Sequence, residues 1–120
     1  MFPEPSGPPL NVKIVNATST SFTLTWDPPL EPNGIILGYD VMYYECDESN
    51  KKNIHGSINE RRHTIDDLHP YRCYRMHVAC KSSGGSGAYS DCVEGWTKPE
   101  GERDVRVLSS LCGLRVIHKI

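Results

Sequence analysis

Apolar and polar side chains alternate along most of this chain with a period of two. Phe22, Leu24 and Trp26 are separated by single threonines, and residues 37–46 and 74–80 continue the same alternation. Successive side chains of a β-strand point to opposite faces, so this period predicts strands with one buried face. Before roughly the last twenty residues, no segment repeats its apolar residues at helical spacing.

Turn-forming residues divide this alternating pattern into about seven short strands. The break after Trp26 contains three prolines and ends in Asn33-Gly34, a pair that tolerates positive φ. The break at 82–87 consists of serine and glycine. Strands spaced by roughly 8–12 residues are typical of an antiparallel sandwich. We therefore predict an all-β fold with strands at residues 10–15, 19–26, 37–46, 54–58, 63–66, 71–81 and 88–97.

The chain has 120 residues, which is enough for one domain with its own hydrophobic core. Large side chains that share the inward face of the predicted strands would fill the space between two sheets about 10 Å apart. The predicted core consists of Trp26, Tyr39, Val41, Tyr43, Leu68, Tyr74, Met76 and Val78.

Several motifs occur in an order and spacing typical of one known family. The chain contains WDPPLEPNGIILGYDVMYY, then Leu68-His69-Pro70 followed by Tyr74, then GSGAYS shortly before Thr97. Over about residues 8 to 99, these motifs resemble the fibronectin type III domain, especially modules of receptor-type tyrosine phosphatases and neural adhesion molecules. The resemblance implies a seven-stranded antiparallel immunoglobulin-like β-sandwich. It also implies that the Tyr74 hydroxyl bonds to the backbone a few residues upstream.

The resemblance divides the chain into three parts. Residues 1–8 form a proline-rich linker, residues 9–99 the domain, and residues 100–120 a linker with the incomplete start of a second module. Residues 104–107 repeat the polar–apolar alternation of residues 11–14, but the repeat lacks its tryptophan. Alternatively, the tail is a divergent end, or an amphipathic segment that packs on the sandwich.

Five cysteines in a chain of this size suggest disulfides, although the number is odd. In the fold implied by the resemblance, Cys46 and Cys73 share the outward face of paired strands and could lie opposite each other. Cys80 and Cys92 flank the 82–87 turn and form a second candidate pair. Alternatively, Cys80 is a small buried core residue. If both candidate pairs form, Cys112 is left over and is either free or part of an intermolecular bond.

Cys46, Cys73 and His77 most resemble a set of metal ligands, but their spacing does not suit one ion. Cys73 and His77 are four residues apart on one strand and therefore roughly 13 Å apart, whereas ligand bonds measure about 2.0–2.3 Å. We expect no metal site and no cofactor. The sequence contains no nucleophile elbow, phosphate loop or zinc-protease motif, so we also expect no catalytic residues and no enzymatic activity.

Three residues are candidates for contacts with a protein partner. Arg61 and Arg62 lie in the basic segment 59–63. The alternative interpretation of this segment is a solvated loop without a partner. Trp96 has outward parity near the end of the last strand. The net charge of −2 and the mixed distribution of charges argue against nucleic acid as a partner. No apolar run approaches the roughly 20 residues that cross a bilayer, so we expect no direct membrane insertion.

The cysteines and the acceptor triplet Asn16-Ala17-Thr18 favour an extracellular glycoprotein. The first ten residues lack the features of a signal peptide, so we expect a piece of a longer chain. We predict a non-catalytic protein-interaction and spacer module in the extracellular part of a cell-surface adhesion or signalling receptor. Its neighbours in the longer chain would be further modules of the same kind, so that the modules form a series of repeats. The alternatives are a cytoplasmic scaffolding or muscle-type module, and an accessory module of a secreted enzyme.

Overall fold

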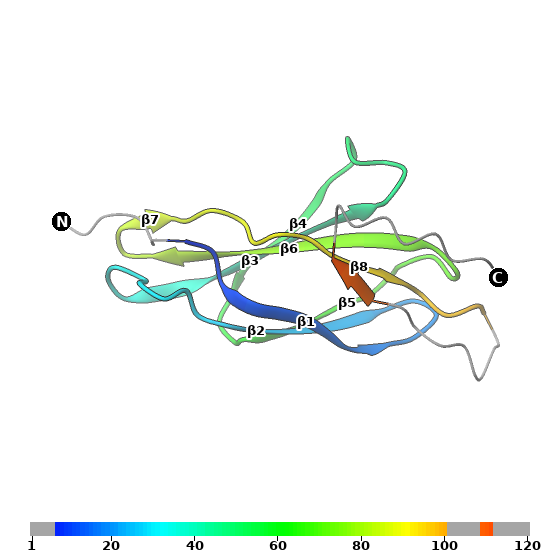
Figure 1. Cartoon of the computed structure of the whole chain (residues 1–120), viewed down its shortest axis with the longest axis horizontal. Coiled ribbons are helices and arrows are strands. Elements are labelled where there is room, and N and C mark those ends of the chain that lie inside the picture. Colours follow the sequence, from blue (N-terminus) through cyan, green and yellow to red (C-terminus); the bar gives the residue numbers. More distant parts are fainter. Residues whose placement is uncertain (1–6, 101–108, 112–120) are drawn as a thin grey trace.

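The computed structural model describes residues 7–100 and 109–111, whose regular structure is all β-strand (Figure 1). The strands are β1 Leu10–Ala17, β2 Phe22–Asp27, β3 Ile36–Glu45, β4 Asn53–Ile58, β5 Arg62–Ile65, β6 Cys73–Ser82, β7 Gly85–Ser86, β8 Val93–Trp96 and β9 Ser109–Leu111. In this part of the chain, no helix is long and apolar enough to span a bilayer.

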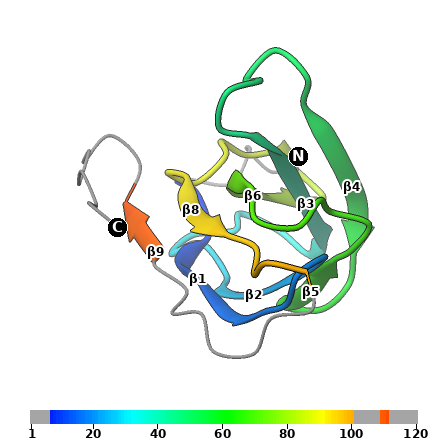
Figure 2. The same cartoon turned by 90° about the vertical axis from the view of Figure 1, so that its right-hand side faces the viewer.

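Two antiparallel sheets lie face to face. One has the strand order β1-β2-β5, and the other has the order β4-β3-β6-β8-β9, with β7 paired to β6 (Figure 2). The predicted all-β sandwich is confirmed. Its seven principal strands are accompanied by the two-residue β7 and the three-residue β9.

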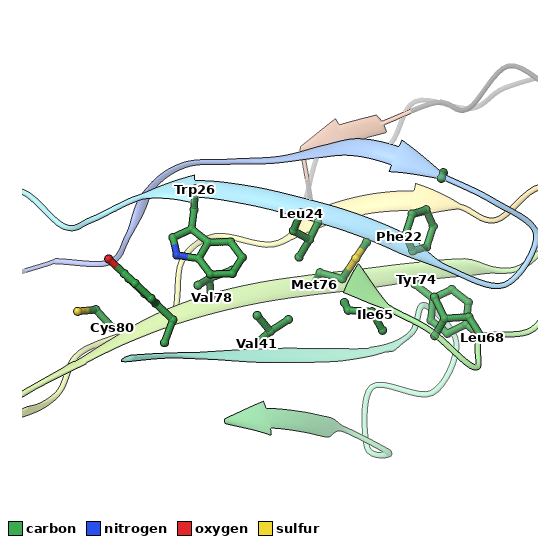
Figure 3. Packing of buried hydrophobic residues seen from close by; sticks show 12 residues of the cluster. Phe22, Leu24, Trp26, Val41, Ile65, Leu68, Tyr74, Met76, Val78 and Cys80 are labelled. Atoms are coloured by element: carbon green, nitrogen blue, oxygen red, sulfur yellow. The ribbon is translucent and has the colours of Figure 1, made fainter. Parts of the chain in front are cut away.

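The core lies between the sheets and follows the alternation of the sequence. Along β6, Tyr74, Met76 and Val78 are buried, whereas Arg75 and His77 are half-exposed. Burial of each large apolar side chain contributes roughly 1.5–3 kcal/mol. Figure 3 shows the packed set, which includes Phe22, Leu24, Trp26, Val41, Ile65, Leu68, Tyr74, Met76, Val78 and Cys80.

Two differences separate this core from the predicted one. Tyr43 is half-buried at the edge of the core, because its hydroxyl turns towards His55. The predicted set also lacks Phe22, Leu24 and Ile65, whose side chains are fully buried. The remaining seven predicted core residues are buried.

Tyr74 fixes the crossing from β5 to β6. The backbone N–H of His69 donates a hydrogen bond of 2.8 Å to the Tyr74 hydroxyl, as the resemblance implied. The Thr97 hydroxyl donates to the His69 carbonyl at 2.6 Å. The segment between the two sheets is thereby tied to both β6 and the end of β8.

Strand β1 begins at one end of the sandwich, and strand β8 ends at the other (Figure 1). Leu10, the first residue of β1, pairs with Asp27, whereas Trp96, the last residue of β8, pairs with Cys73 at the start of β6. We call these the entry end and the exit end. At the entry end, the β2–β3 loop is tied to the turn after β6, because the Ser83 N–H donates to the Ile35 carbonyl at 2.8 Å.

The predicted linkers and second module lie mostly outside the described residues. Within the segment 100–120, residues Ser109–Leu111 are described, and they pair antiparallel with β8. Leu111 lies opposite Val93, and Ser109 lies opposite Gly95. The division of the chain at residues 8 and 99 stays a prediction.

Candidate functional site

A disulfide joins the end of β3 to the start of β6. Register pairs Glu45 with Tyr74, so the next two residues, Cys46 and Cys73, face each other with Cα atoms 5.4 Å apart. The Cys46 N–H also donates to the Cys73 carbonyl at 2.9 Å. A carboxylate oxygen of Glu94 lies within 4.8 Å of both sulfur atoms. The two sulfur atoms are bonded to each other, so Cys46 and Cys73 form a covalent link between β3 and β6.

The predicted pair Cys80–Cys92 is wrong. Cys80 is a free, buried thiol, and Cys92 is disulfide-bonded but not to Cys80. Register explains the difference. Val93 pairs with Met76, which places Cys92 beside residue 77, while the Gly87 N–H bonds to the carbonyl of Cys80. Burial raises the pKa of the Cys80 thiol, which keeps it protonated and unreactive. The prediction for Cys112 falls outside the described residues.

A chain of three polar rings crosses the open edge of the sandwich. The Tyr43 hydroxyl lies 3.4 Å from His55 Nε2, and His55 Nδ1 lies 2.8 Å from His63 Nε2. His55 belongs to β4 and His63 to β5, so this short contact joins edge strands of different sheets. The sequence motifs did not indicate this pair. The available signal was two histidines, eight residues apart, on consecutive short strands.

The environment of His63 favours its neutral imidazole. Burial lowers the pKa of His63, and the neighbouring His55 lowers it further, against the opposite effect of Asp66. Beside the pair lies a shallow recess, which is lined by Ile58, Asn59, Glu60, Arg62, His63 and Thr64. Both imidazoles are half-buried, and His63 is reachable from solvent through this recess.

His77, by contrast, has a structural role. Its Nδ1–H donates to the Ser90 carbonyl at 2.8 Å, so Nε2 accepts a hydrogen bond from the Tyr44 hydroxyl at 3.1 Å. The imidazole also stacks on the Tyr44 ring, with centroids 5.8 Å apart. Both ring nitrogens are thus engaged, and His77 holds the segment before β8 against β6.

The predicted partner contacts do not form one surface. Arg61 is exposed and pairs with Asp27 at 3.7 Å, and exposed Arg62 lies opposite Thr25 in β2. Trp96 lies at the exit end and packs against Tyr71, with ring centroids 5.4 Å apart. The structure therefore separates the arginines from the indole. The arginines and the indole therefore stay separate candidates for contact with a protein partner.

Exposed apolar residues gather at the entry end. Leu30 is 81% exposed, Ile35 71% and Leu37 56%, and all three lie in the β2–β3 loop or at the start of β3. Asn16 is exposed on β1, so its side chain is accessible for modification. The hydroxyl of Thr18, the third residue of the acceptor triplet, lies 2.7 Å from the Ser21 hydroxyl.

Comparison with known proteins assigns the sandwich to a family. The family described as Fibronectin type III domain matches residues 7–102. This chain belongs to the fibronectin type III family. The solution structure of a fourth fibronectin III domain from a human protein superposes with a TM-score of 0.73 at 31% identity, covering 87% of this chain and 88% of that one. The resemblance inferred from the sequence motifs is confirmed.

The fibronectin type III domain is similar to parts of much longer receptors. Ephrin type-A receptor 8 of Mus musculus is 35% identical over 102 residues, which cover 84% of this chain and 10% of the receptor. Receptor-type tyrosine-protein phosphatase F of Danio rerio is 36% identical over 95 residues, which cover 78% of this chain and 5% of that protein. The chain thus spans a tenth or less of these relatives. It is similar to one of their modules.

Proposed function

We propose that this fibronectin type III domain is an extracellular, non-catalytic spacer and protein-interaction module of a cell-surface receptor. The observation that carries the proposal is the Cys46–Cys73 disulfide. The cytosol keeps thiols reduced, whereas disulfides persist in oxidising compartments. Similarity to modules of two classes of receptor supports the same location.

The course of the chain supports the spacer role. Leu10 begins β1 at the entry end, and Trp96 ends β8 at the exit end. A preceding module would therefore attach at the entry end, and a module that follows directly on β8 would attach at the exit end, so modules joined in this way would extend in series. The sandwich between them is held by a continuous core and by the Cys46–Cys73 disulfide, which resist deformation.

The entry end supports the interaction role. Exposed apolar side chains in a contiguous group are typical of a contact surface. Leu30, Ile35 and Leu37 are more than half-exposed beside the point where the chain enters β1. A neighbouring module or a protein partner at this end would cover them.

Mapping the thiols tests the location. The chain is expressed through a secretory pathway, unfolded without reductant, alkylated and digested for mass spectrometry. We expect Cys46 and Cys73 to be recovered as one linked peptide and Cys80 to be alkylated. Alkylation of both Cys46 and Cys73 in secreted material would contradict the proposal and favour the cytoplasmic alternative.

The same secreted material reports on Asn16. We propose Asn16 as a glycan acceptor, because it is exposed and lies in an acceptor triplet. An amide-cleaving glycosidase should lower the mass of the wild-type chain and leave Asn16→Gln unchanged. A wild-type mass that the glycosidase leaves unchanged would refute this assignment without affecting the disulfide result.

A further inference from the structure

His55 and His63 place two metal-ligating nitrogens together at the edge of the sandwich. His55 Nδ1 and His63 Nε2 are 2.8 Å apart, with ring centroids 5.1 Å apart and ring planes at 89°. Imidazole nitrogen is a preferred ligand of Zn²⁺ and related divalent transition-metal ions. We propose that these two residues form a binding site for such an ion, with Zn²⁺ as its representative.

The distance between the nitrogens is close to that required by one ion. Zn–N bonds of about 2.0–2.1 Å in tetrahedral geometry separate two ligand nitrogens by roughly 3.3 Å. The pair must therefore open by about half an ångström, with a rotation of the rings towards the recess beside His63. Both side chains are half-buried, so the backbone positions are fixed while the rings keep room to turn.

Tyr43 supplies the partner that a ligating imidazole needs. Its hydroxyl lies 3.4 Å from the other nitrogen of His55, Nε2, and can hold the ring while Nδ1 binds the ion. Metal-bound histidines commonly bond through the second nitrogen in this way, which fixes the tautomer and the orientation. The negative charge of Asp66 acts on His63 and also favours the binding of a cation there. The positively charged guanidinium of Arg62, which lines the recess, disfavours it.

Binding leaves the number of protons unchanged. One hydrogen lies between the two nitrogens before the ion arrives. The hydrated ion forms one bond to each nitrogen and releases all but two of its water ligands, which complete the tetrahedron. The hydrogen moves through solvent to the second nitrogen of the ring that carried it. A site with two protein ligands should bind in the micromolar range, more weakly than a structural zinc site.

A bound ion would join β4 to β5, and therefore one sheet to the other. The two strands are connected along the chain by residues 59–61 alone. An ion that binds the folded state stabilises it by mass action. At saturating Zn²⁺ we expect the Tm of the domain to rise by several degrees.

Titration of the full 120-residue chain with Zn²⁺ by calorimetry tests the proposal. We expect one ion per chain at this site, and no binding of Mg²⁺, which prefers oxygen ligands. His55→Asn and His63→Asn should each weaken binding at least tenfold, and the double variant should bind no more weakly than the single ones. His69→Asn is the matched control, because His69 is exposed and its backbone, not its ring, bonds to Tyr74.

Equal affinities of the wild type, His55→Asn and His63→Asn would overturn the proposal, as would no Zn²⁺ binding at millimolar concentration. Far-UV circular dichroism without metal checks that the variants are folded. Imidazole nitrogen NMR of the wild type gives an answer that needs no variant. Zn²⁺ should shift His55 Nδ1 and His63 Nε2, and unchanged resonances at both atoms would contradict the site.

Discussion

Among single residues, the aromatic side chains packed between the two sheets contribute most to holding them together. Trp26 and Tyr39 meet edge to face with ring centroids 5.4 Å apart, and Trp26 is 3% exposed. Phe22 and Tyr74 make a similar contact at 6.1 Å towards the exit end. Such pairs add about 0.5–1.5 kcal/mol beyond the burial of their area. Each ring thus stabilises both sheets at once.

Replacement of Trp26 with alanine should lower the free energy of unfolding by about 3–5 kcal/mol, because it opens a large cavity in the core. This is much of the stability of an ordinary domain. Denaturant titration with the disulfide intact measures the change. Trp96→Ala is the control, since that indole is 44% exposed and should cost far less. A loss below about 1 kcal/mol for Trp26→Ala would contradict its place in the core.

At the scale of elements, the β3–β6 pair organises the larger sheet. Its register runs from Ile36 opposite Ser82 to Glu45 opposite Tyr74, and the disulfide closes it at the exit end. The hydrogen-bonded ladder and the covalent bond therefore act on the same two strands. β4, on the other side of β3, and β8, on the other side of β6, depend on this pair for their position.

Removal of the disulfide in Cys46→Ala/Cys73→Ala should lower the free energy of unfolding by about 2–4 kcal/mol. The bond closes a loop with a sequence separation of 27, and release of that loop increases the entropy of the unfolded chain. Urea titration of the double variant measures the effect. The variant is preferable to a reducing agent, which would also act on Cys92. Unchanged stability would show that the bond does not constrain the unfolded chain.

At the scale of the whole molecule, the closed sandwich removes phenols from water. Burial raises the pKa of Tyr39, Tyr43 and Tyr74 above the ordinary value of 10.0. The folded protein therefore holds these protons more tightly than the unfolded chain. Stability from this source is fully present below pH 10 and is lost as the pH rises through the folded-state pKa values.

The free energy of unfolding should therefore fall with increasing pH above about 10. Tyr39→Phe should make this fall less steep, because one of the buried phenols no longer titrates. Urea titrations at several pH values between 8 and 11 measure the slope. Tyr71→Phe, at a ring that is 50% exposed, is the control. Identical slopes for Tyr39→Phe and the wild type would contradict the role of Tyr39.

Local features of the fold could be predicted from the sequence. Alternation predicted the burial of Tyr74, Met76, Val78 and Cys80 in β6, although Ala79, on the outward parity, is buried as well. The resemblance carried by Leu68 and Tyr74 implied the corner hydrogen bond. In the fold implied by the resemblance, the shared parity of Cys46 and Cys73 made them a candidate pair, and the structure contains this disulfide. These features depend on the pleat of one strand or on the ends of two neighbouring strands, so short stretches of sequence are sufficient to reveal them.

Contacts between side chains that are distant in the sequence become visible only in the folded protein. Register between β6 and β8 placed Cys92 away from Cys80, and the course of the strands separated Arg62 from Trp96. The approach of His55 to His63 depends on how the edges of two sheets lie over each other. Such contacts follow from the register and packing of whole strands and sheets. Register and packing are fixed by the combined burial of many residues, so no single stretch of sequence encodes them.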